Sequence, residues 1–376
     1  MKSVPNRTAA LACLAPPATG KYHPTPGPDV PRDLPNLRDP EGFLPSIQAK
    51  ARLLREGYEA GRKAAKPGLR ADGLLFAGMG FSGMCANLVK DAATRALDLP
   101  FSIVKHYQFP QHVKKGWHVL AITYSGETEE TLAVVRTAQQ RGVGVTAFST
   151  GGSIAKLVDR VVPQPPGYQP RAAFAYTWFS VLGFLEGSGV LKDTVPIDEC
   201  VKAVLEVDAA CGPDVPIEHN EAKALAKQIW RPIPQIYATP AYYGVGLHFR
   251  GMLNENAKKI ADVDLVPESN HNDLTGWGGD AENRRHFTVL CLSHANQNPQ
   301  LRRRLDYMEE RYRSWGVPWT NLTSDPITNF QDHVVQQARM IQFLDYTSVY
   351  VAALKGEDPA EIREIKALKA HLKATK

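Results

Sequence analysis

The sequence predicts an α/β protein with two parallel sheets whose faces are covered by helices. From Gly73 onward, short apolar segments alternate with amphipathic helical segments. The apolar segments are continuous, which is typical of parallel strands buried on both faces. The pattern restarts near Pro234, so the two halves resemble a repeat of one α/β unit.

The elements of the first half follow from hydrophobic periodicity. A helix is predicted over residues 41–65, where one face is apolar. Short apolar runs predict strands over 74–77, 101–104, 118–122, 143–148 and 158–162. Helices are predicted over 86–96, 127–141 and 172–185.

The second half repeats this alternation after an ill-defined connection. Strands are predicted over 234–238, 287–292 and 317–322, and helices over 245–260, 301–315, 334–354 and 359–372. We expect three units, namely an irregular Pro-rich arm (1–40), a first domain (41–190) and a second domain (191–376).

Composition restricts the function classes. The net charge is +5, and the basic residues are spread along the chain rather than clustered, which argues against nucleic-acid binding and is compatible with an anionic substrate. The five cysteines are scattered and form no C-x-x-C pair, so no disulfide framework is expected and a cytoplasmic location is predicted. No apolar run is long enough to span a membrane.

A glycine-rich turn, Gly78–Gly83, lies between the first predicted strand and the following helix. Glycines let the backbone approach a ligand closely, and a helix N-terminus favours an anion. The spacing matches G-x-G-x-x-G, but no acidic residue follows a second strand at the distance that a dinucleotide site requires. We therefore interpret the turn as a phosphate-binding loop.

Hydroxyl residues gather in a second loop, Thr123–Thr131, which also follows a strand and opens a helix. Part of this composition is typical of a helix N-cap with acidic residues in its first turn. Ligands of open α/β sheets bind at the carboxyl ends of the strands. The two loops are therefore predicted to converge on one phosphate.

The densest polar region is in the second half. It contains Asn254-Glu255-Asn256-Ala257-Lys258 and, further on, a loop with Glu268, His271 and Asn272. Glu255 and Lys258 are one helical turn apart, so a surface ion pair is one interpretation. Asparagine is a poor helix former, so the two asparagines that flank Glu255 suggest that their cost to helix stability is offset by a gain elsewhere in the protein.

The two loops of the first half resemble the sugar isomerase (SIS) domain, a flavodoxin-like unit that binds phosphorylated sugars. The S-x-S-G-x-T loop of the family is matched by Thr123–Thr128, and its G-G-S turn by Gly80–Ser82, with Phe81 in place of a glycine. The resemblance implies that the phosphate is bound by Gly80, Ser82, Thr123, Ser125 and Thr128. Phe81 is expected to narrow the pocket or reorient the loop.

The N-E-N-x-K and P-E-x-x-H-N segments are similar to those of the bifunctional phosphoglucose/phosphomannose isomerase branch of SIS proteins. This resemblance implies interconversion of glucose 6-phosphate with fructose 6-phosphate through a cis-enediol, with mannose 6-phosphate as a candidate second aldose. It implies Glu255 as the base, Arg171 as the group that stabilises the enediolate, and His271 and Lys369 in ring opening, with Lys366 as the alternative lysine. It also implies a homodimer that shares the active site.

The expected chemistry needs no redox cofactor and no metal, because a carboxylate and a cation suffice for the proton transfer. The sequence has no H-x-H or H-E-x-x-H cluster of the kind that binds zinc. Two other functions are kept open. One is an aminosugar isomerase, which Phe81 motivates. The other is a non-catalytic phosphosugar sensor, which would usually carry a DNA-binding module that the Pro-rich arm does not resemble.

Overall fold

The computed structural model of the chain describes residue 39, residues 42–94 and residues 96–374. The predicted arm lies outside these residues except for Asp39, and so does Cys13. The Asp39 carboxylate accepts hydrogen bonds from the backbone N–H groups of Phe43 and Leu44, at 2.6 and 2.8 Å. This contact fixes the start of the first helix.

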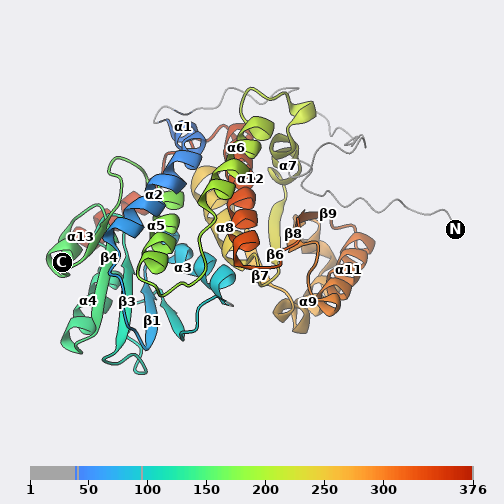
Figure 1. Cartoon of the computed structure of the whole chain (residues 1–376). Coiled ribbons are helices and arrows are strands. Elements are labelled where there is room, and N and C mark those ends of the chain that lie inside the picture. The colour runs from blue at the N-terminus through green and yellow to red at the C-terminus, as the bar shows by residue number, and fades with distance from the viewer. Residues whose placement is uncertain (1–38, 40–41, 95, 375–376) are drawn as a thin grey trace.

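Two parallel sheets form the frame of the molecule (Figure 1). The first has the order β2-β1-β3-β4-β5 and consists of β1 (Gly73–Ala77), β2 (Phe101–Val104), β3 (Trp117–Ile122), β4 (Gly144–Ser149) and β5 (Val161–Pro163). The second has the order β7-β6-β8-β9 and consists of β6 (Ile233–Ala238), β7 (Asp262–Leu265), β8 (Phe287–His294) and β9 (Trp319–Ser324). The order 2-1-3-4 recurs in both sheets, as in flavodoxin-like folds, so the predicted fold class and the repeat are confirmed.

Helices connect the strands and cover both sheets. In the first half they are α1 (Phe43–Gln48), α2 (Lys50–Ala64), α3 (Gly80–Ala93), α4 (Glu129–Gln140), η2 (Ser153–Lys156) and α5 (Phe174–Gly187). In the second half they are α6 (Ile197–Cys211), η3 (Ile217–His219), α7 (Glu221–Ile229), α8 (Tyr243–Asn256), η4 (Glu268–His271), α9 (Asp273–Gly279), α10 (Ala281–Arg284), α11 (Pro299–Ser314), α12 (Phe330–Lys355) and α13 (Arg363–Ala374).

One continuous apolar core joins the two sheets. The inner faces of both sheets pack on a shared layer of helices that includes α2, α3, α5, α8 and α12 (Figure 1). The outer face of the first sheet packs against α4, and the outer face of the second against α11. The sheets are therefore held in one body, although the domain boundary at residue 190 stays a prediction.

Several elements differ from the prediction. The helix over 41–65 is divided at Ala49 into α1 and α2, and α3 begins at Gly80, so the glycine turn forms its first turn. The edge strand β7 was not predicted, because exposed Asp262 interrupts its apolar pattern. The connection after residue 185 contains α6 and α7.

Within the described residues, no helix has the length and apolarity needed to cross a membrane. The same part of the chain holds no cluster of three or more His, Cys, Asp or Glu that could bind a metal ion.

A buried ionic cluster links three helices of the shared layer. The Lys50 ammonium (α2) pairs with one carboxylate oxygen of Asp345 (α12), and His248 Nε2 (α8) lies 2.7 Å from the other. All three side chains are almost fully buried. Burial alone would raise the pKa of Asp345, but the charges and hydrogen bonds of Lys50 and His248 hold it below its usual value. The cluster therefore depends on all its members being present.

We predict that Asp345→Ala lowers the free energy of unfolding by about 3–5 kcal/mol, because it leaves the Lys50 ammonium buried without its carboxylate. Urea denaturation measures the change. The control is Asp98→Ala, which breaks an exposed ion pair with Lys192 and should change stability little. A similar small change for both variants would contradict the prediction.

Candidate active site

The two predicted phosphate loops meet at the carboxyl edge of the first sheet. They follow β1 and β3, which are neighbours in the sheet. A Cβ at Gly78 would lie 2.7 Å from the carbonyl oxygen of Ile122, the last residue of β3, and one at Gly83 would lie 2.5 Å from the Gly78 carbonyl oxygen. Only glycine permits such close contact. Gly78 therefore lets the first loop approach the end of β3, and Gly83 lets the first loop fold tightly on itself.

The hydroxyl groups of the second loop are organised by internal hydrogen bonds. The Thr123 and Thr128 hydroxyl oxygens are 2.9 Å apart, and Ser125 Oγ accepts a hydrogen bond from the Glu127 N–H. Thr128 is the N-cap residue of α4, but its side chain makes no capping hydrogen bond. Glu127 turns to Ser153, whose N–H and hydroxyl donate to its carboxylate at 2.6 and 2.8 Å. The loop is thus pinned, with Ser125 exposed at its tip.

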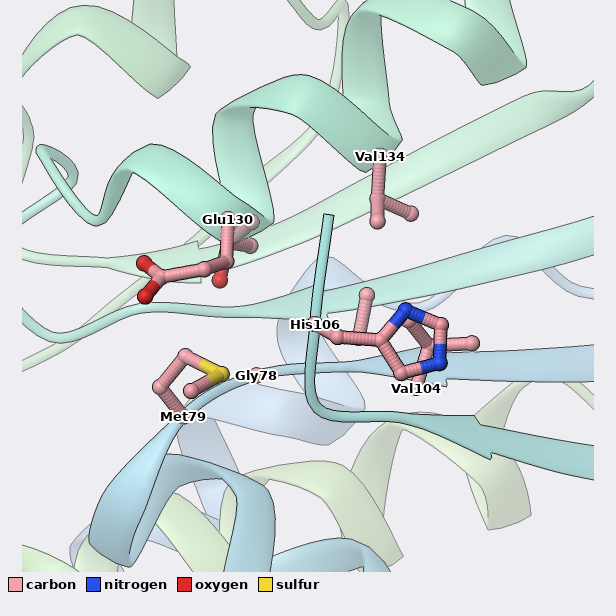
Figure 2. Close-up of a pocket in the computed structure, with 8 residues that line it drawn as sticks. Gly78, Met79, Val104, His106, Glu130 and Val134 are labelled. Carbon is pink, nitrogen blue, oxygen red and sulfur yellow. The ribbon is translucent and has the colours of Figure 1, made fainter. Parts of the chain in front are cut away.

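A small hollow lies beside the first loop, between β1, β2 and α4 (Figure 2). Met79, Val104, His106 and Glu130 are among the side chains that line it, and they leave no room for a water-sized sphere. The His106 ring is held there by the Gln108 N–H, which donates to its Nδ1 at 3.0 Å. The hollow is therefore filled by its own side chains.

Phe81 does not narrow the phosphate loop. Its ring is buried and packs edge-on against Phe174 of α5 and His248 of α8. A Cβ at Gly251 of α8 would lie 2.9 Å from Phe81 Cζ, so α8 approaches the loop at a glycine. Glu255 follows Gly251 by one helical turn on the same face of α8. This packing sets α8, the helix that carries Glu255, against α3, the helix that begins with the Gly80–Ser82 turn.

Glu255 is paired with the buried Arg171 guanidinium. Arg171 Nη1 donates to Glu255 Oε2 at 2.9 Å, and the two side chains are 1% and 24% exposed, respectively. Burial raises the pKa of Glu255, whereas the charges of Arg171, Lys369 and Lys258 act in the opposite direction. Burial prevails, so the pKa of Glu255 lies above its usual value, which favours a role as a general base.

Three segments of the chain hold the Arg171 guanidinium. Its Nε donates to Asn256 Oδ1 at 2.8 Å, and its Nη2 to the Pro359 carbonyl oxygen at 2.6 Å. The Phe43 ring lies 4.8 Å from the guanidinium carbon and covers it. The Asn256 amide donates to Ser348 Oγ at 2.9 Å. Asn256, the second asparagine of the N-E-N-x-K motif, therefore holds the Arg171 guanidinium in place.

The backbone after α8 is shaped for this site. Lys258 is a non-glycine residue with positive φ (48°), a conformation that costs roughly 1–2 kcal/mol. Its ammonium donates to the carbonyl oxygens of Glu255 and Asn256, at 3.0 and 3.3 Å, and to that of Asp358. Lys258 thus caps α8 and connects it to the segment that contacts Arg171. The ammonium of Lys258 bonds to backbone carbonyl oxygens, so it does not serve as a simple surface ion pair with the Glu255 carboxylate.

A tyrosine connects the phosphate loop to the segment before Arg171. The Tyr124 hydroxyl donates to the Pro165 carbonyl oxygen and accepts a hydrogen bond from the Tyr168 N–H at 3.0 Å. Sequence reasoning assigned no role to Tyr124, and of Asn256 it expected only an unspecified gain that offsets the poor helix propensity of asparagine. The position of Tyr124 inside the T-x-S-G-x-T loop was the available signal for the first of them.

The two predicted ring-opening residues are placed differently. Lys369 on α13 lies close enough to Glu255 for its charge to lower the pKa of the carboxyl group, whereas Lys366 pairs with Glu361 at 3.2 Å. His271 is exposed at the end of η4. Glu255 precedes β7 and His271 follows it, so the length of the second sheet separates them, and no hydrogen bond or ion pair joins them within the described residues.

The comparisons with known proteins agree with this architecture. Residues 218–372 match the family model of the bacterial phospho-glucose isomerase C-terminal SIS domain. A bifunctional phosphoglucose/phosphomannose isomerase from Aquifex aeolicus is 29% identical over 310 residues, which cover 80% of this chain and 90% of the relative. A D-glucosamine-6-phosphate 4-epimerase from Sulfolobus acidocaldarius is 26% identical over 58% of this chain and 69% of its own length.

Among solved structures, the C-terminal domain of glucosamine-fructose-6-phosphate aminotransferase from Francisella tularensis aligns with a TM-score of 0.66 and 14% identity, covering 85% of this chain and 98% of that one. The chain has two parallel-sheet α/β subdomains, and the second of them matches an SIS-domain model. Over most of its length the chain is similar to bifunctional phosphoglucose/phosphomannose isomerases, which confirms the resemblance noted in its sequence.

The Arg171 contacts lead to a prediction. Asn256→Ala should lower the free energy of unfolding by about 1–3 kcal/mol, because it removes the acceptor of a buried guanidinium N–H. Chemical denaturation measures this loss. Asn254→Ala is the matched control on the other side of Glu255: Asn254 is exposed, and its removal should cost no more than about 0.5 kcal/mol. Equal effects would show that Asn256 does not support Arg171.

Proposed function

We propose that the protein interconverts glucose 6-phosphate and fructose 6-phosphate, with mannose 6-phosphate as a second aldose substrate. The enzyme is of the phosphosugar isomerase type. The substrate assignment draws on the relatives, several of which are bifunctional phosphoglucose/phosphomannose isomerases. The observation that carries the proposal is the pairing of Glu255 with the buried Arg171 guanidinium at 2.9 Å, because it sets a carboxylate beside a fixed cation.

The proposed reaction is a proton transfer between C1 and C2 of the open-chain sugar through a cis-enediol. The phosphate is held by the Gly80–Ser82 turn and by the Thr123–Thr128 loop. Glu255 takes the proton from one carbon and returns it to the other. The Arg171 guanidinium, 2.9 Å from the carboxylate, places a fixed positive charge beside the developing enediolate. The exposed Lys369 ammonium lies on the substrate side and assists ring opening.

We further propose that His271 acts in a homodimer, with the imidazole at each Glu255 site supplied by a second copy. The support is its position, since His271 is exposed after β7, whereas Glu255 lies before β7 near the end of α8. We place the enzyme in the cytoplasm, since the cysteines of the described residues are buried free thiols: Cys85, Cys200, Cys211 and Cys291.

The reason for considering an aminosugar isomerase no longer holds. It rested on Phe81 altering the substrate pocket, but the Phe81 ring lies in the core between α3, α5 and α8.

A coupled assay of fructose 6-phosphate formation tests the proposal, with glucose 6-phosphate, mannose 6-phosphate and glucosamine 6-phosphate as substrates. Glu255→Gln should lower turnover by about 10²- to 10⁴-fold with little change in KM, because it removes the base. Ser125→Ala with Thr128→Ala is the contrasting variant and should raise KM instead. Absence of turnover with both hexose phosphates would refute the proposed function.

Mixing two impaired variants tests donation of His271 between chains. Glu255→Gln and His271→Ala homodimers should each be strongly impaired. After co-expression, half of the dimers are mixed and have one complete site of two, so about a quarter of wild-type activity should return. Each variant refolded alone is the control. No recovery in the mixture would mean that both residues act within one chain.

A further inference from the structure

The hydroxyl-rich loop after β3 is fixed to the first sheet through its backbone. The Tyr124 carbonyl oxygen accepts hydrogen bonds from the N–H and the hydroxyl of Thr150, each at 2.9 Å. The Gly126 N–H donates to the Thr123 carbonyl oxygen at 3.1 Å and closes the turn. A Cβ at Gly126 would lie 1.9 Å from the Gly151 carbonyl oxygen, so the loop lies directly on the segment after β4. None of these contacts involves the Tyr124 side chain, so the loop keeps its shape when that side chain is changed.

The Tyr124 side chain extends from this loop to the segment that carries Arg171. Its hydroxyl donates to the Pro165 carbonyl oxygen and accepts a hydrogen bond from the Tyr168 N–H at 3.0 Å. The side chain is half-buried, and burial raises the pKa of its hydroxyl, which therefore stays protonated and able to donate. One hydroxyl group thus joins two points of the Arg171 segment to the loop.

The Arg171 segment, residues 164–173, connects β5 to α5 and forms no helix or strand. It contains three prolines, which have no N–H to donate, so side chains supply much of its support. The Gln169 side-chain amide donates to the Ala360 carbonyl oxygen at 3.0 Å. The segment is therefore held on one side by Tyr124 of the first half and on the other by the chain that follows α12.

These contacts connect the loop to the acid–base pair. Tyr124 holds the Arg171 segment at Tyr168, and three residues later the Arg171 guanidinium donates to the Glu255 carboxylate at 2.9 Å. Binding of a part of the substrate that does not react accelerates a reaction when it orients the reacting groups. Under the proposed function, on which this inference rests, the phosphate is that part of the substrate.

We propose that Tyr124 is a positioning residue that links occupation of the phosphate loop to the placement of Arg171 beside Glu255. Its hydroxyl acts through Arg171 and does not touch the reacting carbons. The phosphate thus contributes to turnover as well as to affinity, and the Tyr124 hydroxyl is the group through which it does so.

Tyr124→Phe tests the link, because it keeps the ring and removes both hydrogen bonds. The kcat for glucose 6-phosphate should fall about 10- to 100-fold, since Arg171 is no longer fixed relative to the bound phosphate. KM should change less than about 3-fold, because the loop that binds the phosphate is unaltered. Steady-state kinetics of fructose 6-phosphate formation measures both constants.

Tyr176→Phe is the matched control. Tyr176 lies on α5, and its hydroxyl donates at 3.2 Å to the carbonyl oxygen of Pro163, immediately before the Arg171 segment. The variant loses a tyrosine hydroxyl of the same kind without affecting the loop, so kcat and KM should stay within about two-fold of wild type. An equal fall in kcat for both variants overturns the proposal. So does a Tyr124→Phe variant with unchanged kcat, whether or not its KM rises.

Hydrogen exchange gives a readout that does not depend on turnover. In the wild type, saturating inorganic phosphate should slow amide exchange in residues 123–128 and also in residues 167–173. In Tyr124→Phe, residues 123–128 should still be protected, whereas the protection of residues 167–173 should be lost. Phosphate-dependent protection of both regions in the variant overturns the link.

The two measurements separate this inference from the proposed function. A wild-type protein that turns over no hexose phosphate but shows the linked protection refutes the isomerase proposal and leaves the link between the loop and the Arg171 segment standing. Isomerase activity that Tyr124→Phe retains in full has the opposite meaning. Protection of neither region in the wild type overturns the link together with the proposed phosphate site.

Discussion

The candidate active site depends on one buried cation, the guanidinium of Arg171. A buried charge is stable only when its hydrogen bonds are satisfied, and the acceptors here come from distant parts of the chain. Asn256 and Glu255 belong to the second half, Arg171 belongs to the first, and Pro359 follows α12. These contacts fix the position of Glu255 relative to the first sheet, and the same positive charge counteracts the effect of burial on its pKa.

Much of the fold could be predicted from the sequence, because parallel strands buried on both faces are apolar throughout. β1, β3 and β8 are of this kind. β7 could not be found in this way, since an edge strand with Asp262 and Asp264 has no continuous apolar pattern. The helix α6 was missed although its signal was present: Cys200, Val204, Val207 and Cys211 are buried and recur at helical spacing.

The site was predictable where residues adjacent in sequence act together. The polar loops were expected at the strand ends, and the structure places them after neighbouring strands, where Gly78 permits close contact with the end of β3. The function of Asn256 could not be deduced, since it depends on Arg171 and on Ser348, which is 92 residues away. The orientation of the Phe81 side chain could not be predicted from the sequence either. Its ring packs against Gly251 of α8, a residue far along the chain, and so points away from the loop.

The two halves share a strand order but differ at the edge where ligands usually bind. In the first sheet, glycines follow β1 and leave space at the loop. At the corresponding place in the second sheet, Tyr242 is fully buried and its hydroxyl donates to Ser324 Oγ. The hydroxyls of Thr239 and Ser293 are likewise engaged, with the Leu292 carbonyl oxygen and with Thr323. The polar groups at that edge are therefore already engaged within the chain. The repeat thus gives two equivalent edges with different polar surroundings, and the glycine turn and hydroxyl loop that we propose to hold the phosphate lie at the first of them.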